Sequence, residues 1–223
     1  MRRIKLCDRV LPVYSKAEEC FNAISHIIGV ALGLTVLAQS LITATIQGSG
    51  ISLLCAAVYG ASMIALYTMS AIYHGLHPGT AKKVFQILDH CTIYFLIAGT
   101  YLPIVLCAIR PEYPVIGWGL FAAEYLLAII ATVFTAIDLK AYRVYSMICY
   151  IGMGWAVIFF LPQTIAVMTL PGFRLLLAGG IAYTVGAVLF GLGRKLKWMH
   201  SAFHVFVLLG SILQYLAIIL YVF

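Results

Sequence analysis

Charge is the property that this sequence has least of, and the shortage excludes most soluble folds. Only 9% of its 223 residues are Asp, Glu, Lys or Arg, whereas 64% are hydrophobic. A soluble domain carries roughly 25% charged residues, and one core of this size cannot hold so many apolar side chains. Lipid has to cover the excess. The composition therefore predicts a membrane protein with no nucleic-acid partner, even though the net charge is +7.

Neither a cysteine-based site nor a cleaved signal peptide is expected. The six cysteines show no Cys-x-x-Cys spacing and four of them lie inside apolar runs, so neither a disulfide framework nor a cysteine-bound zinc is expected. The first 19 residues are too polar for a signal sequence, and the apolar run after them continues to about Ile46. We expect residues 1–19 to form a cytoplasmic N-terminal segment and residues 20–223 to form one transmembrane domain.

Long apolar runs are abundant, and they predict an all-α fold of seven transmembrane helices. A helix needs about 20 apolar residues to cross a bilayer. Pro103 and Pro162 lie inside two of the runs and predict local kinks there. Turn residues separate the runs at positions 47–50, 77–79, 110–112, 138–143, 170–172 and 193–197. The predicted spans are 21–46, 51–74, 87–109, 115–137, 144–168, 174–192 and 199–222.

The cations fall on one side of this arrangement. Only Arg110 and Arg174 lie on the side opposite the N-terminus. Loops rich in Lys and Arg normally stay in the cytoplasm, so we expect a cytoplasmic N-terminus, a C-terminus on the outer side, and a multi-pass location in the bacterial plasma membrane. The cations on the predicted cytoplasmic side are Arg2, Arg3, Lys5, Arg9, Lys16, Lys82, Lys83, Lys140, Arg143, Arg194, Lys195 and Lys197.

Several polar side chains in or beside the apolar runs share one depth, because each lies at the cytoplasmic end of its predicted helix. Ionisable residues inside a helix bundle generally indicate a functional site. Their coincidence at one level is the most informative pattern in the sequence. The residues are His26, Ser70, His74, Asp89, His90, His200 and His204.

Spacing within this group favours a metal site. His200 and His204 are four residues apart, so both rings project from one helix face and can share one ion. Together with His74 they form a three-histidine set that leaves a fourth position for water, which is typical of catalytic zinc. Ser70 and Asp89 are then expected to hold that water and accept its proton.

Each feature has a simpler interpretation when taken alone. Histidines at helix ends often lie among lipid head groups, Ser70 is of a type that bonds back to its own helix, and Asp89 near a helix start is favoured by the dipole. We expect His90 at the interface, because it points about 100° away from Asp89 on a helix, and His77 in a solvated loop. Glu124 lies deep in the fourth span without an evident partner.

Several of these residues also belong to motifs that occur together, and with them the chain from about residue 17 onward resembles the bacterial hemolysin III family, which is related to the progestin and adiponectin receptors. The resemblance implies a seven-helix fold and a zinc ion held by His74, His200 and His204. It also implies that Asp89 and Ser70 contact the metal-bound water. The motifs are Glu19-x-x-Asn22-x-x-Ser25-His26, Ser70-x-x-x-His74, Phe85-Gln-Ile-Leu-Asp89-His90, Gly99-Thr100-Tyr101-x-Pro103 and His200-x-x-x-His204, and the first of them has no assigned role.

The expected function is zinc-dependent hydrolysis of a membrane lipid amide or ester, because eukaryotic relatives of the family act on ceramide-like amides. One alternative is a lipid-state sensor or receptor-like regulator in which zinc is structural. A second is a hemolysin III-type cytolytic protein, although the missing export signal disfavours pore formation from outside. Transport is disfavoured because the site lies near one face, whereas transporters usually bind their substrates near the bilayer midplane.

Overall fold

Helices make up almost all of the computed structural model, which describes residues 5–193 and 195–223. No β-strand occurs in that part of the chain, so the all-α prediction is confirmed. The elements in chain order are the 3-10 helix η1 (Leu6–Asp8), α1 (Lys16–Gln47), α2 (Gly50–Gly75), α3 (Thr80–Pro103), the π-helix η2 (Ile104–Ile109), α4 (Arg110–Glu112), α5 (Pro114–Ile137), α6 (Arg143–Gly154), the 3-10 helix η3 (Ala156–Phe160), α7 (Leu161–Leu192) and α8 (Met199–Tyr221).

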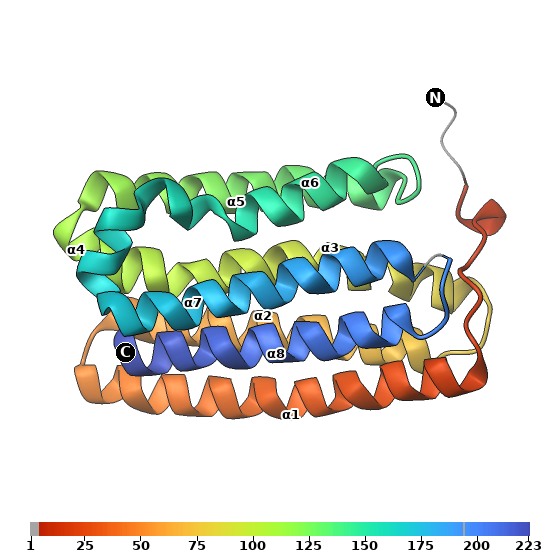
Figure 1. Ribbon diagram of the computed structural model, residues 1–223, viewed down its shortest axis with the longest axis horizontal. Helices are drawn as coiled ribbons and strands as arrows, with labels where there is room; N and C mark the ends of the chain where they lie inside the picture. The colour runs from red at the N-terminus through yellow and green to blue at the C-terminus, as the bar shows by residue number, and fades with distance from the viewer. Residues whose placement is uncertain (1–4, 194) are drawn as a thin grey trace.

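The long helices lie side by side in a bundle (Figure 1). Helix α1 packs against both α2 and α8, and α8 in turn packs against α7. The N-terminal segment crosses the end of the bundle where α1, α3 and α8 begin, and the C-terminus lies at the opposite end. Residues that start or end different helices at the first of these ends are therefore brought together.

Local sequence determines where α1 begins and ends. The Ser15 hydroxyl accepts the backbone N–H of Glu18, and the Glu18 carboxylate accepts the backbone N–H of Ser15, which is a capping box. At the other end Gly48 adopts a left-handed conformation with φ 68°, which favours glycine. Helix α1 thus begins at Lys16, four residues before the predicted start of the transmembrane domain.

Six helical stretches in the described residues are long and apolar enough to cross a membrane. One of them, Arg143–Leu192, has 50 residues and contains both the fifth and the sixth predicted spans. At about 1.5 Å per residue this stretch is far longer than the roughly 30 Å hydrocarbon layer. It is interrupted by η3 and by Thr169, whose φ of 63° is not helical. The six stretches are Lys16–Gln47, Gly50–Gly75, Thr80–Glu112, Pro114–Ile137, Arg143–Leu192 and Met199–Tyr221.

The predicted turn residues are confirmed in part. The interruption at Thr169 adjoins the expected turn at 170–172, and the irregular η3 ends just before Pro162, which lies in the first turn of α7. Pro103 ends α3 and is followed by the π-helix η2, so an irregularity occurs where a kink was predicted.

The turn predicted at 110–112 is wrong. These residues form the short helix α4, and the chain turns at Tyr113 instead. Two local features explain the difference. The Arg110 side chain donates from Nε to the backbone oxygen of Leu106, and Pro111 occupies a first-turn position that tolerates proline.

The outer surface and the core both match a lipid environment. Large aliphatic side chains lie exposed along the helices, for example Ile28, Leu34 and Ile42 on α1. The interior holds fully buried tyrosines, including Tyr59 and Tyr67. A surface of this kind is stable only in an apolar solvent.

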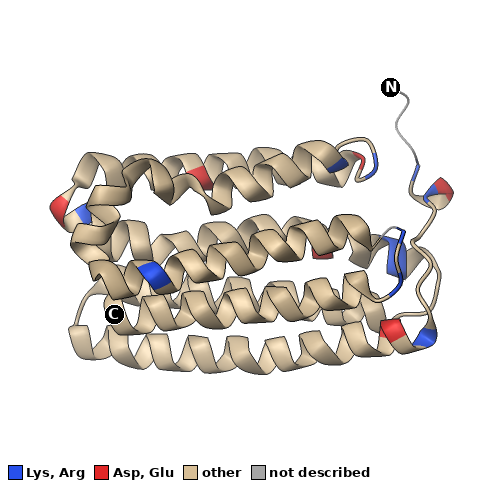
Figure 2. Cartoon of the chain, in the orientation of Figure 1, with Lys and Arg blue, Asp and Glu red and all other residues tan. Residues whose placement is uncertain are grey.

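Most charged residues lie at the two ends of the bundle, and most Lys and Arg lie at the end crossed by the N-terminal segment (Figure 2). The uneven distribution of Lys and Arg predicted from the sequence is therefore also present in the folded structure. Arg2, Arg3 and Arg194 belong to the predicted cytoplasmic set but lie outside the described residues. The orientation relative to the membrane stays a prediction.

Candidate metal centre

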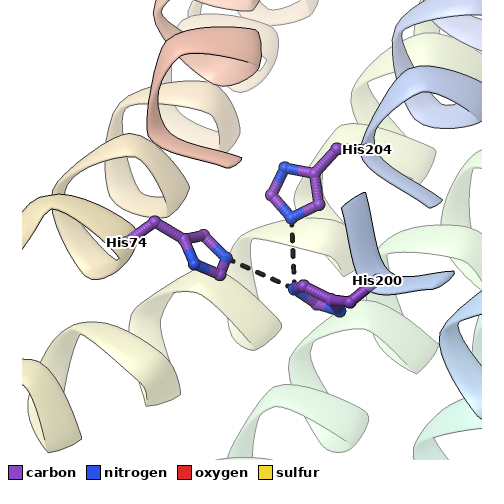
Figure 3. A group of neighbouring side chains, drawn as sticks. All are labelled: His74, His200 and His204. Carbon is purple, nitrogen blue, oxygen red and sulfur yellow. Dashed lines mark hydrogen bonds between the residues drawn. The ribbon is translucent and has the colours of Figure 1, made fainter. Parts of the chain in front are cut away.

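Three histidines from two helices meet at the end of the bundle that carries most of the cations (Figure 3). His74 is the second-last residue of α2, and His200 and His204 lie in the first two turns of α8. All three side chains are buried. Because α1 packs against both α2 and α8, it holds the two ligand-bearing helices in place.

The three rings direct their Nε2 atoms toward one point (Figure 3). His200 Nε2 lies 3.3 Å from His74 Nε2 and 3.2 Å from His204 Nε2. One ring nitrogen can be chosen from each residue so that the three atoms all lie within 4.8 Å of one another. Zinc binds imidazole nitrogen at about 2.0–2.1 Å, so two ligands of a tetrahedral ion are separated by roughly 3.3 Å. The two measured separations match this value, so the cluster could hold a metal ion.

Hydrogen bonding around the rings also favours a cation. The Nδ1–H of His74 donates to Glu19 Oε2 at 2.6 Å. The Ser25 hydroxyl donates to the Asn22 carbonyl and accepts from His204 Nδ1 at 3.5 Å. In neutral rings the Nε2 atoms of His74 and His204 are then acceptors only. His200 Nε2 can donate a single proton, so at least one buried lone pair lacks a donor, and a metal ion would satisfy it.

Tyr14 covers the three-histidine cluster on the side of the N-terminal segment. Its ring stacks on His200 with centroids 4.8 Å apart and planes 20° apart, and it lies 5.9 Å from the His74 ring. Burial, and to a smaller degree the nearby carboxylate of Glu19, raises the pKa of Tyr14 above its usual value. The phenol therefore stays neutral and contributes a ring surface rather than an anionic ligand.

Ser70 and Asp89, predicted to act beside the metal, line a cavity that also reaches His200 and His26. The cavity has a volume of about 130 Å³ and is lined by residues of α1, α2, α3, α6, α7 and α8. Cavities of comparable size in proteins bind small apolar molecules. Away from these polar groups its walls are mostly apolar, with Ile97, Met147, Ile151, Ala187 and Val207 among the lining residues.

His26, left without a role by the sequence, contacts the cluster directly. Its ring stacks on His204 at 3.8 Å between centroids and meets the Tyr67 ring edge-on at 5.0 Å. The side chain is buried, and neither ring nitrogen has a hydrogen-bond partner among the described residues. His26 therefore supports His204 through ring contact and presents unpaired nitrogen atoms beside the cavity.

Two other predictions at this end of the bundle have different outcomes. His77 is exposed in the loop after α2, as predicted. His90 is partly buried and lines the cavity, and its Nδ1 donates to the Gln86 carbonyl at 2.8 Å and lies 3.8 Å from Asp89 Oδ2, while its place at the interface stays a prediction. The Cα–Cβ bonds of His90 and Asp89 point about 100° apart on the helix, but both side chains are flexible enough to approach each other.

Glu124 lies farther along the bundle in α5. It is buried, and its Oε2 atom has no hydrogen-bond partner in the described residues. The structure therefore keeps it apart from the three-histidine cluster.

The sequence analysis did not identify the residues that surround the three histidines without belonging to the predicted ligand set. Tyr14 precedes every motif, and Lys82 looks like an ordinary loop cation, but its Nζ lies 2.7 Å from Glu19 Oε1. The one available signal was the Glu19-to-His26 motif. All four residues that it names prove to face the cluster: Glu19 and Asn22 toward His74, and Ser25 and His26 toward His204.

The fold and the cluster define a multi-pass helical protein of the cell membrane with a buried three-histidine group that could bind a metal ion. A family model described as "Haemolysin-III related" matches residues 14–215. The chain therefore belongs to the hemolysin III family.

Individual relatives agree with this assignment. The chain is 40% identical over 205 residues to "Hemolysin-3" of Bacillus cereus, which covers 92% of each protein. It is 34% identical over 209 residues to "Hemolysin-3 homolog" of Bacillus subtilis (strain 168), covering 94% of this chain and 96% of the relative. A more distant similarity, 26% over 169 residues, joins it to human "Monocyte to macrophage differentiation factor", covering 72% of this chain and 67% of that protein.

Proposed function

We propose that this protein is a zinc-dependent hydrolase that cleaves a lipid amide or ester near the cytoplasmic face of the membrane. The observation that carries the proposal is that His200 belongs to two features at once. Its Nε2 joins the three-histidine cluster, and its side chain lines the apolar cavity that contains Asp89 and Ser70. A metal site that opens on an apolar cavity suits a substrate with an acyl chain.

The proposed topology has seven crossings with the N-terminus in the cytoplasm. In Figure 1, α6 runs away from the end crossed by the N-terminal segment and most of α7 runs back toward that end, which supports two crossings by the stretch Arg143–Leu192. Most Lys and Arg lie at the end of the bundle crossed by the N-terminal segment, and this supports a cytoplasmic N-terminus. The three-histidine cluster would then lie at the level of the inner leaflet.

Each residue of the site would have a separate task. His74, His200 and His204 would hold zinc, which supplies Lewis-acid chemistry by polarising a carbonyl oxygen and making water more nucleophilic. Asp89 would take a proton from the attacking water and return it to the leaving amine or alcohol. Ser70 would orient the water by a hydrogen bond. The acyl carbon gains the water oxygen while its C–N or C–O bond breaks, which yields a fatty acid.

The test measures bound zinc and released fatty acid on the same purified preparations, with N-acyl sphingoid amides and acyl glycerol esters of several chain lengths as substrates. His204→Ala should lose both zinc and hydrolysis. Asp89→Asn should keep zinc and lose about 10²–10⁴-fold in turnover, as expected for a removed general acid–base group. The exposed Glu112 lies away from the site, so Glu112→Gln serves as a control with both quantities unchanged.

A further variant tests whether the cavity binds the acyl chain. Gly180 lines the cavity, and a Cβ built there meets no atom within 4 Å. Gly180→Leu should therefore fill the cavity, keep zinc and reduce hydrolysis of long-chain substrates more than short-chain ones. A wild-type protein that holds zinc but releases no fatty acid from any substrate would overturn the hydrolase proposal and favour a regulator with structural zinc.

A further inference from the structure

Two consecutive glutamates at the start of α1 contact the segments that carry the histidines. Glu18 Oε1 accepts the backbone N–H of Trp198, two residues before His200, at 2.7 Å. Glu19 Oε2 accepts the Nδ1–H of His74 at 2.6 Å. One helix start therefore holds both the end of α2 and the start of α8.

The contact between Glu19 and His74 fixes which nitrogen of His74 carries its proton. A carboxylate can only accept hydrogen bonds, so Nδ1 must be the protonated nitrogen. The lone pair of Nε2 is then directed at His200 Nε2, 3.3 Å away. Since the His74 side chain is completely buried, no water competes for Nδ1.

Lys82 fixes the carboxylate in turn. Its ammonium donates to Glu19 Oε1 at 2.7 Å and to the backbone oxygen of Leu76 at 3.0 Å. The Lys82 side chain is only 4% exposed and that of Glu19 is 21% exposed, so salt and water screen this ion pair less than a pair on the surface. Because both oxygens of Glu19 are engaged, the carboxylate is held away from the point where the three Nε2 atoms meet.

We propose that Glu19 is a positioning residue that orients His74 for metal binding, and that Lys82 holds Glu19 in the required rotamer. This role rests on the proposed function, because it presumes that the three-histidine cluster binds zinc. Carboxylates that accept the second N–H of a ligating histidine fix its tautomer and ring orientation and raise its basicity.

The test compares Glu19→Ala, Glu19→Gln and Lys82→Met with wild type, and uses Glu112→Gln as a matched control for loss of a carboxylate far from the cluster. Zinc affinity is measured by competition with a chromophoric chelator in detergent, without any activity assay. Glu19→Ala should weaken zinc binding by about 10–100-fold. Glu19→Gln keeps an acceptor oxygen and should weaken it less, and Lys82→Met should fall between Glu19→Gln and wild type.

A second readout separates positioning from general stability. The visible spectrum of the Co²⁺-substituted protein reports the ligand geometry, and it should change in Glu19→Ala and return toward wild type in Glu19→Gln. If Glu19→Ala does not fold, Glu19→Gln and Lys82→Met carry the test. Wild-type affinity and spectrum in all three variants would refute the role of Glu19, whereas a wild-type protein that binds neither metal would refute the proposed function itself.

Discussion

At the scale of single residues, the cluster depends on rings that are not ligands. His200 has Tyr14 stacked on one side, and His204 has His26 stacked against it. Tyr14 belongs to the N-terminal strap, residues 5–15, which is attached to the bundle by hydrogen bonds near its start as well as through Ser15. Lys83 Nζ donates to the Cys7 carbonyl at 2.6 Å, and Arg9 donates to the Ile137 carbonyl at 3.1 Å. The strap thus covers the cluster at His200 and His74 through the Tyr14 ring.

Removing the Tyr14 ring should open a path to the metal. Tyr14→Ala is expected to accelerate removal of bound zinc by a soluble chelator by about tenfold, the effect of roughly 1.4 kcal/mol of lost contact on a barrier. Tyr14→Phe should release zinc at the wild-type rate, since the neutral phenol acts through its ring. The measurement is stopped-flow chelation, and equal rates in all three proteins would contradict a covering role.

At the scale of helices, close packing of α1 on α2 determines where the histidines lie. A Cβ placed on Gly29 would come within 2.3 Å of the Tyr67 ring, so only glycine allows this approach. Tyr67 contacts the His26 ring and bonds through its hydroxyl to Ser211 of α8 at 2.7 Å. Tyr67 therefore connects α1, α2 and α8 just below the cluster.

Gly29→Ala is expected to force these helices apart. Overpacking of this kind costs about 1–3 kcal/mol, and the thermal unfolding temperature in detergent should fall accordingly. The control is Gly119→Ala on α5, where an added Cβ meets no atom within 4 Å. Alanine favours a helix interior over glycine, so this control should be neutral or slightly more stable. An equal loss in both variants would argue against the contact with Tyr67.

At the scale of the whole molecule, the number of crossings decides on which side the loop before α8 lies. If Arg143–Leu192 crosses twice, Lys197 is cytoplasmic, whereas a single crossing places it outside. Both Lys197 and Gly50 are exposed in the structure, and so is the native Cys7 of the N-terminal strap. These three positions therefore report on orientation and on crossing number separately.

The proposed topology predicts a definite labelling pattern with a membrane-impermeant maleimide. In a background with Cys20→Ser and Cys107→Ala, native Cys7 should react only after cells are permeabilised. With Cys7→Ser added, Gly50→Cys should react in intact cells, and Lys197→Cys should again require permeabilisation. Labelling of Lys197→Cys in intact cells would indicate six crossings, and a reversed Cys7 and Gly50→Cys pattern would indicate the opposite orientation.

The contacts between ligands and their supports could not be predicted from the sequence. His200 and His204 could be paired because one helix turn sets their spacing, but the partners of His74 depend on how α1 packs. Glu19 and His74 are 55 residues apart, and nothing in their local sequence specifies a 2.6 Å contact. The turn at 110–112 was wrong for a different, local reason, because the Arg110 bond to Leu106 and the π-helix before it extend the helix.

The sequence by itself determined that this chain lies in a membrane, is helical, and has its histidines and Asp89 near one end of the helices, because apolar run length and residue spacing are local properties. Only the tertiary structure decided that the three histidines meet, that Glu19 accepts a hydrogen bond from His74, that Tyr14 stacks on His200, and that Asp89 and Ser70 share a cavity with His200. Such contacts join residues on different helices. They exist only once small residues such as Gly29 let those helices approach.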